Sequence, residues 1–149
     1  MISNNQNDAY RMRRKWPYPT RCTRCDALFQ NGRWTWQDHP ENCSETVCPA
    51  CQRITDNYPA GHIQISGNFY CSHEKELLNL IQNREKIEKK LHPMERIISI
   101  DKQDENLFIT TTGVHLARRI GESLAHSFQG SLHFRYGVAE NSIRVSWER

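Results

Sequence analysis

Two Cys-x-x-Cys pairs are the residues of this chain with the clearest capacity for chemistry. The first pair is Cys22 and Cys25, the second is Cys48 and Cys51, and 22 residues separate them. Each pair places two thiols on one tight turn, so that both sulfurs can bind the same ion. Four thiolates satisfy the tetrahedral preference of zinc and leave no coordination position open, which is typical of a structural site. The sequence therefore predicts a bound Zn2+ with these four cysteines as its ligands.

Other interpretations of the cysteines remain open at this stage. The two pairs could form disulfides or carry unrelated free thiols, and four cysteines also ligate iron–sulfur clusters. Cys43 and Cys71 belong to neither pair, and an isolated cysteine is most often a small buried apolar side chain. Together with His39, His62 or His73 they could instead form a second site or replace one ligand.

The first 24 residues are strongly basic. They hold six arginine or lysine side chains against one acid, a net charge of +5, whereas the whole chain carries +3. We expect residues 1–21 to form a basic, disordered arm that binds a phosphate-rich partner and stacks its aromatic side chains on unpaired bases. A solubilising tail is the alternative. The basic residues expected to contact nucleic acid here are Arg11, Arg13, Arg14, Lys15, Arg21 and Arg24.

The composition is that of a small, polar, ordered protein. The chain has 149 residues and a mean hydropathy of −0.80, yet it contains four Trp, five Tyr and five Phe, which favours thin ordered layers over disorder. Because the chain lacks an apolar run of about 18 residues, we expect no membrane span. Paired Cys-x-x-Cys sequences that bind metal suit a reducing compartment, so we expect a cytoplasmic location.

The apolar pattern predicts an α+β fold that begins with a four-cysteine zinc ribbon at residues 22–71. Asn31-Gly32 is a strong hairpin signal inside the ribbon. Trp34 and Trp36 follow at alternate positions, where they would cover the core beside the metal or offer a stacking platform. We expect a short turn after the second cysteine pair and then a strand at residues 62–67.

A connecting helix and a second domain follow the ribbon. The helix is predicted over residues 72–93, with Ser72 as its N-cap and Pro93 as its stop, and its mixed charges suggest an exposed connector. Residues 94–149 predict a ββαββ domain, a four-stranded sheet covered by one helix from about Val114 to Phe128. Near the start of this helix, Arg118 and Arg119 are further candidates for contact with nucleic acid, although a solvated face is the alternative.

With these elements placed, the chain resembles the ribosomal large-subunit export adaptor family, also called nonsense-mediated mRNA decay protein three. Three stretches carry the resemblance: Cys22 to Trp36, Cys48 to Ile65, and the segment Asp-Glu-Asn-Leu-Phe-Ile-Thr-Thr-Thr-Gly-Val-His-Leu-Ala-Arg-Arg-Ile at residues 104–120. The layout is also similar to that of small stand-alone prokaryotic proteins. A second zinc ribbon, the later β-rich domains and the transport signals of the longer members are missing here.

The resemblance implies binding to the large ribosomal subunit, through ribosomal RNA and neighbouring ribosomal proteins, with the four paired cysteines as zinc ligands. No catalytic residue carries over, and nuclear export does not transfer. We therefore expect a zinc-binding, non-enzymatic protein that docks on ribosomal RNA as an assembly, quality-control or dormancy factor. The alternatives are a zinc-ribbon regulator that binds DNA or a protein partner and, further removed, a thiol-redox or hydrolytic enzyme. Four thiolates would close the coordination position that a hydrolytic zinc needs.

Overall fold

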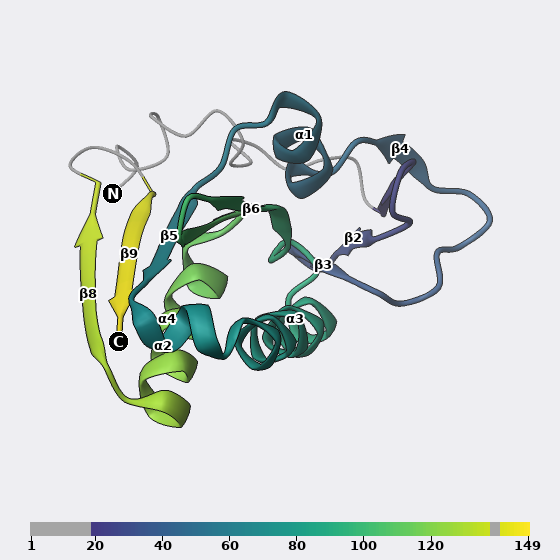
Figure 1. The fold of residues 1–149 in the computed structure, drawn as a ribbon. Coiled ribbons are helices and arrows are strands. Elements are labelled where there is room, and N and C mark those ends of the chain that lie inside the picture. Colours follow the sequence, from purple (N-terminus) through teal and green to yellow (C-terminus); the bar gives the residue numbers. More distant parts are fainter. Residues whose placement is uncertain (1–18, 138–140) are drawn as a thin grey trace.

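The computed structural model describes residues 19–137 and 141–149, which form two sheets and their helices (Figure 1). Part of the predicted turn at residues 137–141 is outside this range. The same holds for four basic residues of the predicted arm, Arg11, Arg13, Arg14 and Lys15.

The smaller sheet contains the predicted hairpin. Its β2–β3 turn has Asn31 at φ 56° and Gly32 at φ 81°. A two-residue type I′ turn needs positive φ at both central positions, which Asn-Gly accepts at low cost. The predicted hairpin is therefore confirmed. The strands are β1 (Thr20–Cys22), β2 (Leu28–Gln30), β3 (Arg33–Thr35) and β4 (Ser44–Thr46), in the order β3-β2-β1-β4.

Helix α1 (Pro49–Asp56) starts at the second cysteine pair, so the predicted short turn is wrong. The Cys48 sulfur accepts a hydrogen bond from the Cys51 amide and caps the helix. Pro49 stands at the first helical position, where its fixed φ is already suitable and its missing N–H is not needed. Asn57, at φ 51°, ends the helix in the left-handed region.

The larger sheet has five strands, so the predicted four-stranded sheet is wrong by one strand. The additional strand is β5, which the sequence analysis assigns to the ribbon. It lies in the middle of the sheet, antiparallel to β7 and parallel to β9. Its buried side chains Ile63 and Ile65 face buried neighbours on both strands, which explains the position. The strands are β5 (Gly61–Ser66), β6 (Ile97–Gln103), β7 (Asn106–Thr111), β8 (Ser131–Tyr136) and β9 (Ile143–Glu148), in the order β6-β7-β5-β9-β8.

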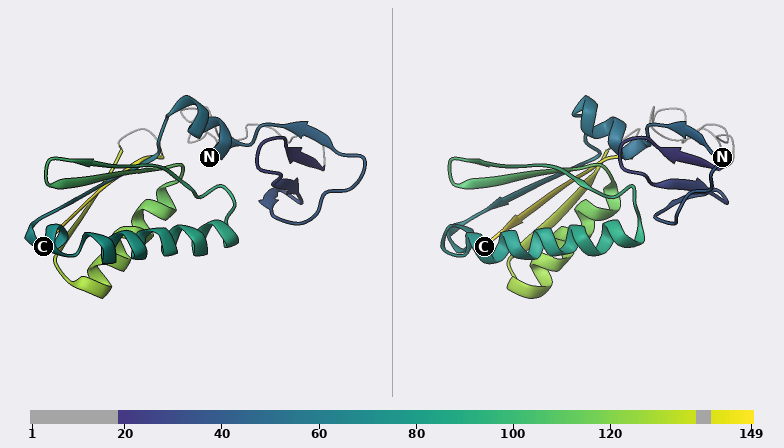
Figure 2. Two further views of the ribbon diagram at one scale, coloured as in Figure 1. Left: turned by 45° about the vertical axis from the view of Figure 1, so that its right-hand side comes forward. Right: turned by 90° about the vertical axis from the view of Figure 1, so that its right-hand side faces the viewer.

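Two helices, α3 (Glu74–Leu91) and α4 (Val114–Phe128), lie on the same side of this sheet (Figure 2). Leu77 and Ile81 of α3 are fully buried in the same core as the inner side chains of α4. The predicted exposed connector is therefore wrong, because α3 is a core helix. Ser72 closes the short helix α2 (Asn68–Ser72), and the residue that caps α3 is His73. Within the described ranges, no helix has both the length and the apolar character needed to cross a lipid bilayer.

Helix α4 begins and ends at the predicted residues, Val114 and Phe128. Its N-cap, Gly113, has no side chain that could satisfy the free amides of the first turn. The Glu95 carboxylate replaces the missing cap and accepts a hydrogen bond from the Leu116 amide at 2.8 Å. The segment between α3 and β6 thereby fixes the start of α4.

Candidate metal centre

The four predicted cysteine ligands converge on one point. Their sulfur atoms all lie within 4.8 Å of one another, and the pairs Cys22–Cys51 and Cys25–Cys48 are each 3.8 Å apart. A tetrahedral zinc ion with Zn–S bonds of about 2.3 Å needs sulfur atoms about 3.8 Å apart. A disulfide would need a separation of about 2.0 Å, and all four cysteines are free. The spacing therefore suits a single tetrahedral ion.

Backbone amides point at the sulfurs and hold this arrangement. The Cys22 sulfur accepts hydrogen bonds from the amides of Arg24 at 3.4 Å and Cys48 at 3.2 Å. The Cys48 sulfur accepts from the Cys51 amide at 3.4 Å. Such N–H donors stabilise negative charge on sulfur and orient each ligand around the ion.

Arg96 lies directly against the sulfurs, although it comes from the segment that leads into β6. Its guanidinium donates to Cys51 at 3.2 Å and to Cys25 at 3.0 Å, with Cys48 at 3.7 Å. The residue is only 6% exposed, and its Nε donates to the Pro93 carbonyl at 2.9 Å. A zinc ion with four thiolates carries a net charge of about −2, and the guanidinium offsets part of it. The sequence analysis missed this residue.

Arg96 and Cys25 favour each other's charged form. Burial acts to lower the pKa of Arg96, but its contacts with Cys25 and Cys51 outweigh burial and raise it. The pKa of Cys25 is lowered, first by the hydrogen bond from Cys48 and further by Arg96. The pKa values of Cys48 and Cys51 are raised, that of Cys48 first by its hydrogen bond with Cys25 and that of Cys51 first by burial. A thiolate is the form that binds a metal ion, and Cys25 is the sulfur that this arrangement favours as a thiolate.

Two aromatic side chains connect the cysteine region to the rest of the molecule. Trp34 packs against the core around the cysteines. Trp36 follows β3 and donates from its indole N–H to the Lys89 carbonyl of α3 at 2.8 Å, while Arg96 lies 5.6 Å from its ring centroid. Trp34 therefore serves packing, which was one of the two predicted roles, whereas Trp36 is 38% exposed and its predicted role as a stacking platform stays a prediction.

The cysteines outside the two pairs do not enter this group. Cys43 lies 3.7 Å from a ring nitrogen of His39, and Cys71 is exposed near Glu105. His73 contacts the Phe69 carbonyl. Within the described part of the chain, the paired cysteines supply all four sulfur atoms of the cluster.

A second group of metal-type side chains joins α3 to α4. Glu88, His92 and His115 bring their ligand atoms within 4.8 Å of one another. His115 Nε2 lies 2.8 Å from Glu88 Oε1, while Arg84 and Arg119 approach Oε2 at 3.4 and 3.5 Å. Because the buried Glu88 carboxylate already lies within 3.5 Å of two guanidinium groups, we interpret Glu88, His92 and His115 as a polar contact that joins α3 to α4.

Four of the basic residues predicted to contact nucleic acid lie in the described ranges, and they do not form one group. Two lie beside the first cysteine pair and two lie on α4. Three of them, Arg21, Arg118 and Arg119, pair with carboxylates at 2.7–3.5 Å. Arg24 donates to the Thr55 hydroxyl at 2.7 Å. Each therefore already has an acceptor within the protein.

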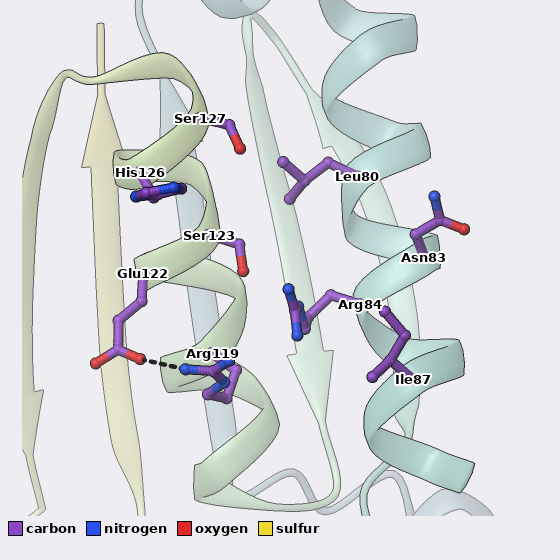
Figure 3. A pocket seen from close by; sticks show the side chains of 9 residues that line it. All are labelled: Leu80, Asn83, Arg84, Ile87, Arg119, Glu122, Ser123, His126 and Ser127. Carbon is purple, nitrogen blue, oxygen red and sulfur yellow. Dashed lines mark hydrogen bonds and ion pairs between the residues drawn. The ribbon is translucent and has the colours of Figure 1, made fainter.

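A groove of about 650 Å³ runs between α3 and α4 (Figure 3). Arg84 and Arg119 face each other across it, and Figure 3 shows Arg119 paired with Glu122. Because Glu88 and Glu122 compensate these two cations, the groove offers little free positive charge.

The face of the larger sheet that points away from α3 and α4 is polar. Arg135 on β8 and Arg144 on β9 lie on it, as do the carboxylates Asp101 on β6 and Glu148 on β9. We call it the open sheet face. Two hollows of about 350 and 330 Å³ lie on it, and both are lined by His62, Arg135 and Arg144. The sequence analysis missed this face because its composition depends on the register of five strands. Its side chains on β5, β7, β8 and β9 include His62, Gln64, Phe108, Thr110, His133, Arg135, Arg144 and Ser146.

The fold and the site define an α+β protein with a four-cysteine cluster that is compatible with zinc. Comparison with protein-family models, with curated proteins and with solved structures finds no match to this chain.

Proposed function

We propose that this protein binds one structural zinc ion, carries no catalytic activity and docks on the ribosomal RNA of the large ribosomal subunit, beside neighbouring ribosomal proteins. Its role there would be that of an assembly, quality-control or dormancy factor. The proposal joins two parts, a metal that stabilises the fold and a surface that binds RNA. Each part has its own support.

The arrangement of four sulfur atoms supports the first part of the proposal, the structural zinc ion. A hydrolytic zinc ion keeps one position open for water, whereas Cys22, Cys25, Cys48 and Cys51 would fill all four positions. A redox-active pair needs an exposed thiol of low pKa; Cys25 is partly exposed and its pKa is lowered, but Cys22, the other cysteine of its pair, is fully buried. A structural zinc ion is the function that this geometry supports best.

Charge distribution and resemblance support the second part. The first 24 residues carry a net charge of +5, which favours a phosphate-rich partner. The open sheet face adds Arg135 and Arg144. The resemblance of three stretches of the sequence to the large-subunit export adaptors directs the proposal to ribosomal RNA.

Sedimentation of the tagged protein through a sucrose gradient tests the docking, at low and at high salt. We expect the protein to travel with large-subunit particles and to leave them as salt rises, because phosphate contacts weaken with salt. Crosslinking to RNA would then locate the contact. Bound zinc without association with ribosomal particles would leave the metal site standing and refute the proposed partner.

Two variants separate the roles of the metal and the arm. Cys48→Ser should lose zinc, unfold the cysteine region and abolish association, while Cys43→Ser is the matched control that should change neither. Deletion of residues 1–15 should weaken association without unfolding the protein. A Cys48→Ser protein that keeps its zinc and its fold would contradict the structural role of the metal.

A further inference from the structure

We infer that the open sheet face binds single-stranded RNA, with Arg135 and Arg144 on the phosphates and Phe108 under a base. The choice of RNA rests on the proposed function. The inference goes beyond that function because it assigns the contact to a surface that none of the predicted basic residues occupies.

The strand register places like charges side by side. Arg135 on β8 stands directly opposite Arg144 on β9, and Arg144 stands beside His62 on β5. Like charges in directly opposed positions destabilise a sheet. Burial, and next the nearby Arg144, lower the pKa of His62. No ion pair joins either arginine to a carboxylate among the residues described, so an anion bound from outside would relieve this repulsion.

The next row of side chains along the strands carries groups that can bind RNA bases. Phe108 on β7 lies beside Gln64 on β5, which lies beside Ser146 on β9 and then His133 on β8; on its other side Phe108 lies beside Asp101 on β6. Aromatic rings on a sheet surface stack on unpaired bases, and amide and hydroxyl groups bind base edges and the ribose 2′-OH. This row therefore has the chemistry of a base platform.

The arginine row, which holds Arg135 and Arg144, and the phenylalanine row, which holds Phe108, are two residues apart along each strand, or about 7 Å. An RNA strand whose phosphates lie over the arginine row can thus place its bases on the phenylalanine row. A duplex keeps its bases stacked inside and offers no free base to a ring on a flat surface. The geometry consequently favours an unpaired strand.

The test measures binding of the zinc-loaded, full-length protein to a fluorescent, unstructured RNA of about 12 nucleotides, over a range of salt concentrations. The double variant Arg135→Gln with Arg144→Gln should bind about 10-fold more weakly at low salt. Its slope of log affinity against log salt should be shallower by about 1.4, because each lost phosphate contact in a single strand removes about 0.7. Phe108→Leu should weaken binding by about 5- to 150-fold and leave the slope unchanged.

The matched control is Lys86→Gln with Lys90→Gln, which removes the same charge from exposed positions of α3 and should match the unaltered protein. Equal binding by the Arg135/Arg144 double variant and the unaltered protein would overturn the inference, as would equal affinity for duplex RNA or for DNA of the same sequence. Near-UV circular dichroism of each variant shows whether the fold is intact. Ribosome sedimentation is a separate measurement, so the inference can fail while the proposed function stands.

Discussion

At the scale of single residues, Arg96 holds the least expected position. A buried guanidinium is costly unless it is fully paired, and here it meets three sulfur atoms and one carbonyl oxygen. Its charge is therefore useful mainly when the sulfurs are thiolates, as they are around a metal ion. This connects the affinity for zinc to a residue far from the ligands in sequence.

Replacement of Arg96 by Met should weaken zinc binding by about 10- to 100-fold, the range measured when groups that support metal ligands are removed. Arg96→Lys should fall in between, because a lysine keeps the charge but cannot donate to several sulfurs in a fixed fork. Competition with a chromogenic chelator measures the affinity. An Arg96→Met protein that releases zinc at the same chelator concentration as the unaltered protein would contradict this role.

The second prediction at the scale of single residues concerns Glu88. Burial acts to raise the pKa of Glu88, but the hydrogen bonds with His115 and Arg84 and the charges of His115 and Arg119 outweigh it, so its pKa lies below the usual value of a glutamate. A lowered pKa in the folded state means that the ionised carboxylate stabilises the fold. This contribution is complete above the ordinary pKa and is lost as the pH falls through the lowered value.

We therefore expect Glu88→Gln to destabilise the protein by about 1–2 kcal/mol at pH 7, because its partners are partly exposed to solvent. The difference from the unaltered protein should shrink as the pH falls below about 4. Urea unfolding at several pH values measures it. Glu122→Gln is the control, a more exposed carboxylate whose loss should cost less than about 0.5 kcal/mol. A difference that stays constant down to acidic pH would contradict the assignment.

At the scale of elements, close contact between α4 and the larger sheet depends on Gly121. A Cβ atom at this position would lie 2.7 Å from Val145 Cγ1 and 3.0 Å from Leu132 Cδ1. Gly121→Ala should therefore destabilise the protein by about 1–3 kcal/mol, although alanine is intrinsically better in a helix by about 1 kcal/mol. Thermal unfolding measures the change. Ser127→Ala, at an exposed position of the same helix, should be neutral or slightly stabilising, and a stabilised Gly121→Ala would show that the helix can move away from the sheet.

Elements with local signals were predictable from the sequence, and elements defined by distant contacts were not. The Asn31-Gly32 hairpin and the apolar pattern of α4 are local signals, and both agree with the structure. The cysteine pairs likewise identify their own site. By contrast, β5 becomes the middle strand through pairing with β7 and β9, more than 40 residues further along the chain. Arg96 reaches Cys25 across 71 positions, and no local pattern predicts such a contact.

At the scale of the whole molecule, the protein has two separate cores. The core around the cysteines contains few apolar side chains beyond the cysteines themselves. The core between the larger sheet and its helices contains only apolar and aromatic residues of the usual kind. Trp36 and Arg96 connect the two regions. A small core of this kind would depend on the proposed metal, since zinc binding to a four-thiolate site contributes about 10 kcal/mol or more to folding.

Removal of the metal should therefore unfold the region up to α1 and leave the larger sheet folded. Hydrogen exchange followed by mass spectrometry, with and without a zinc chelator, measures this by segment. We expect amides of residues 20–56 to lose protection when the chelator is added, while those of β5 and β9 keep it, and added zinc should restore the first group. Chelator saturated with zinc beforehand is the control. Joint loss of protection in both regions would show that the contacts of Trp36 and Arg96 couple the two cores into one cooperative unit, and unchanged protection everywhere would show that the cysteine region folds without its metal.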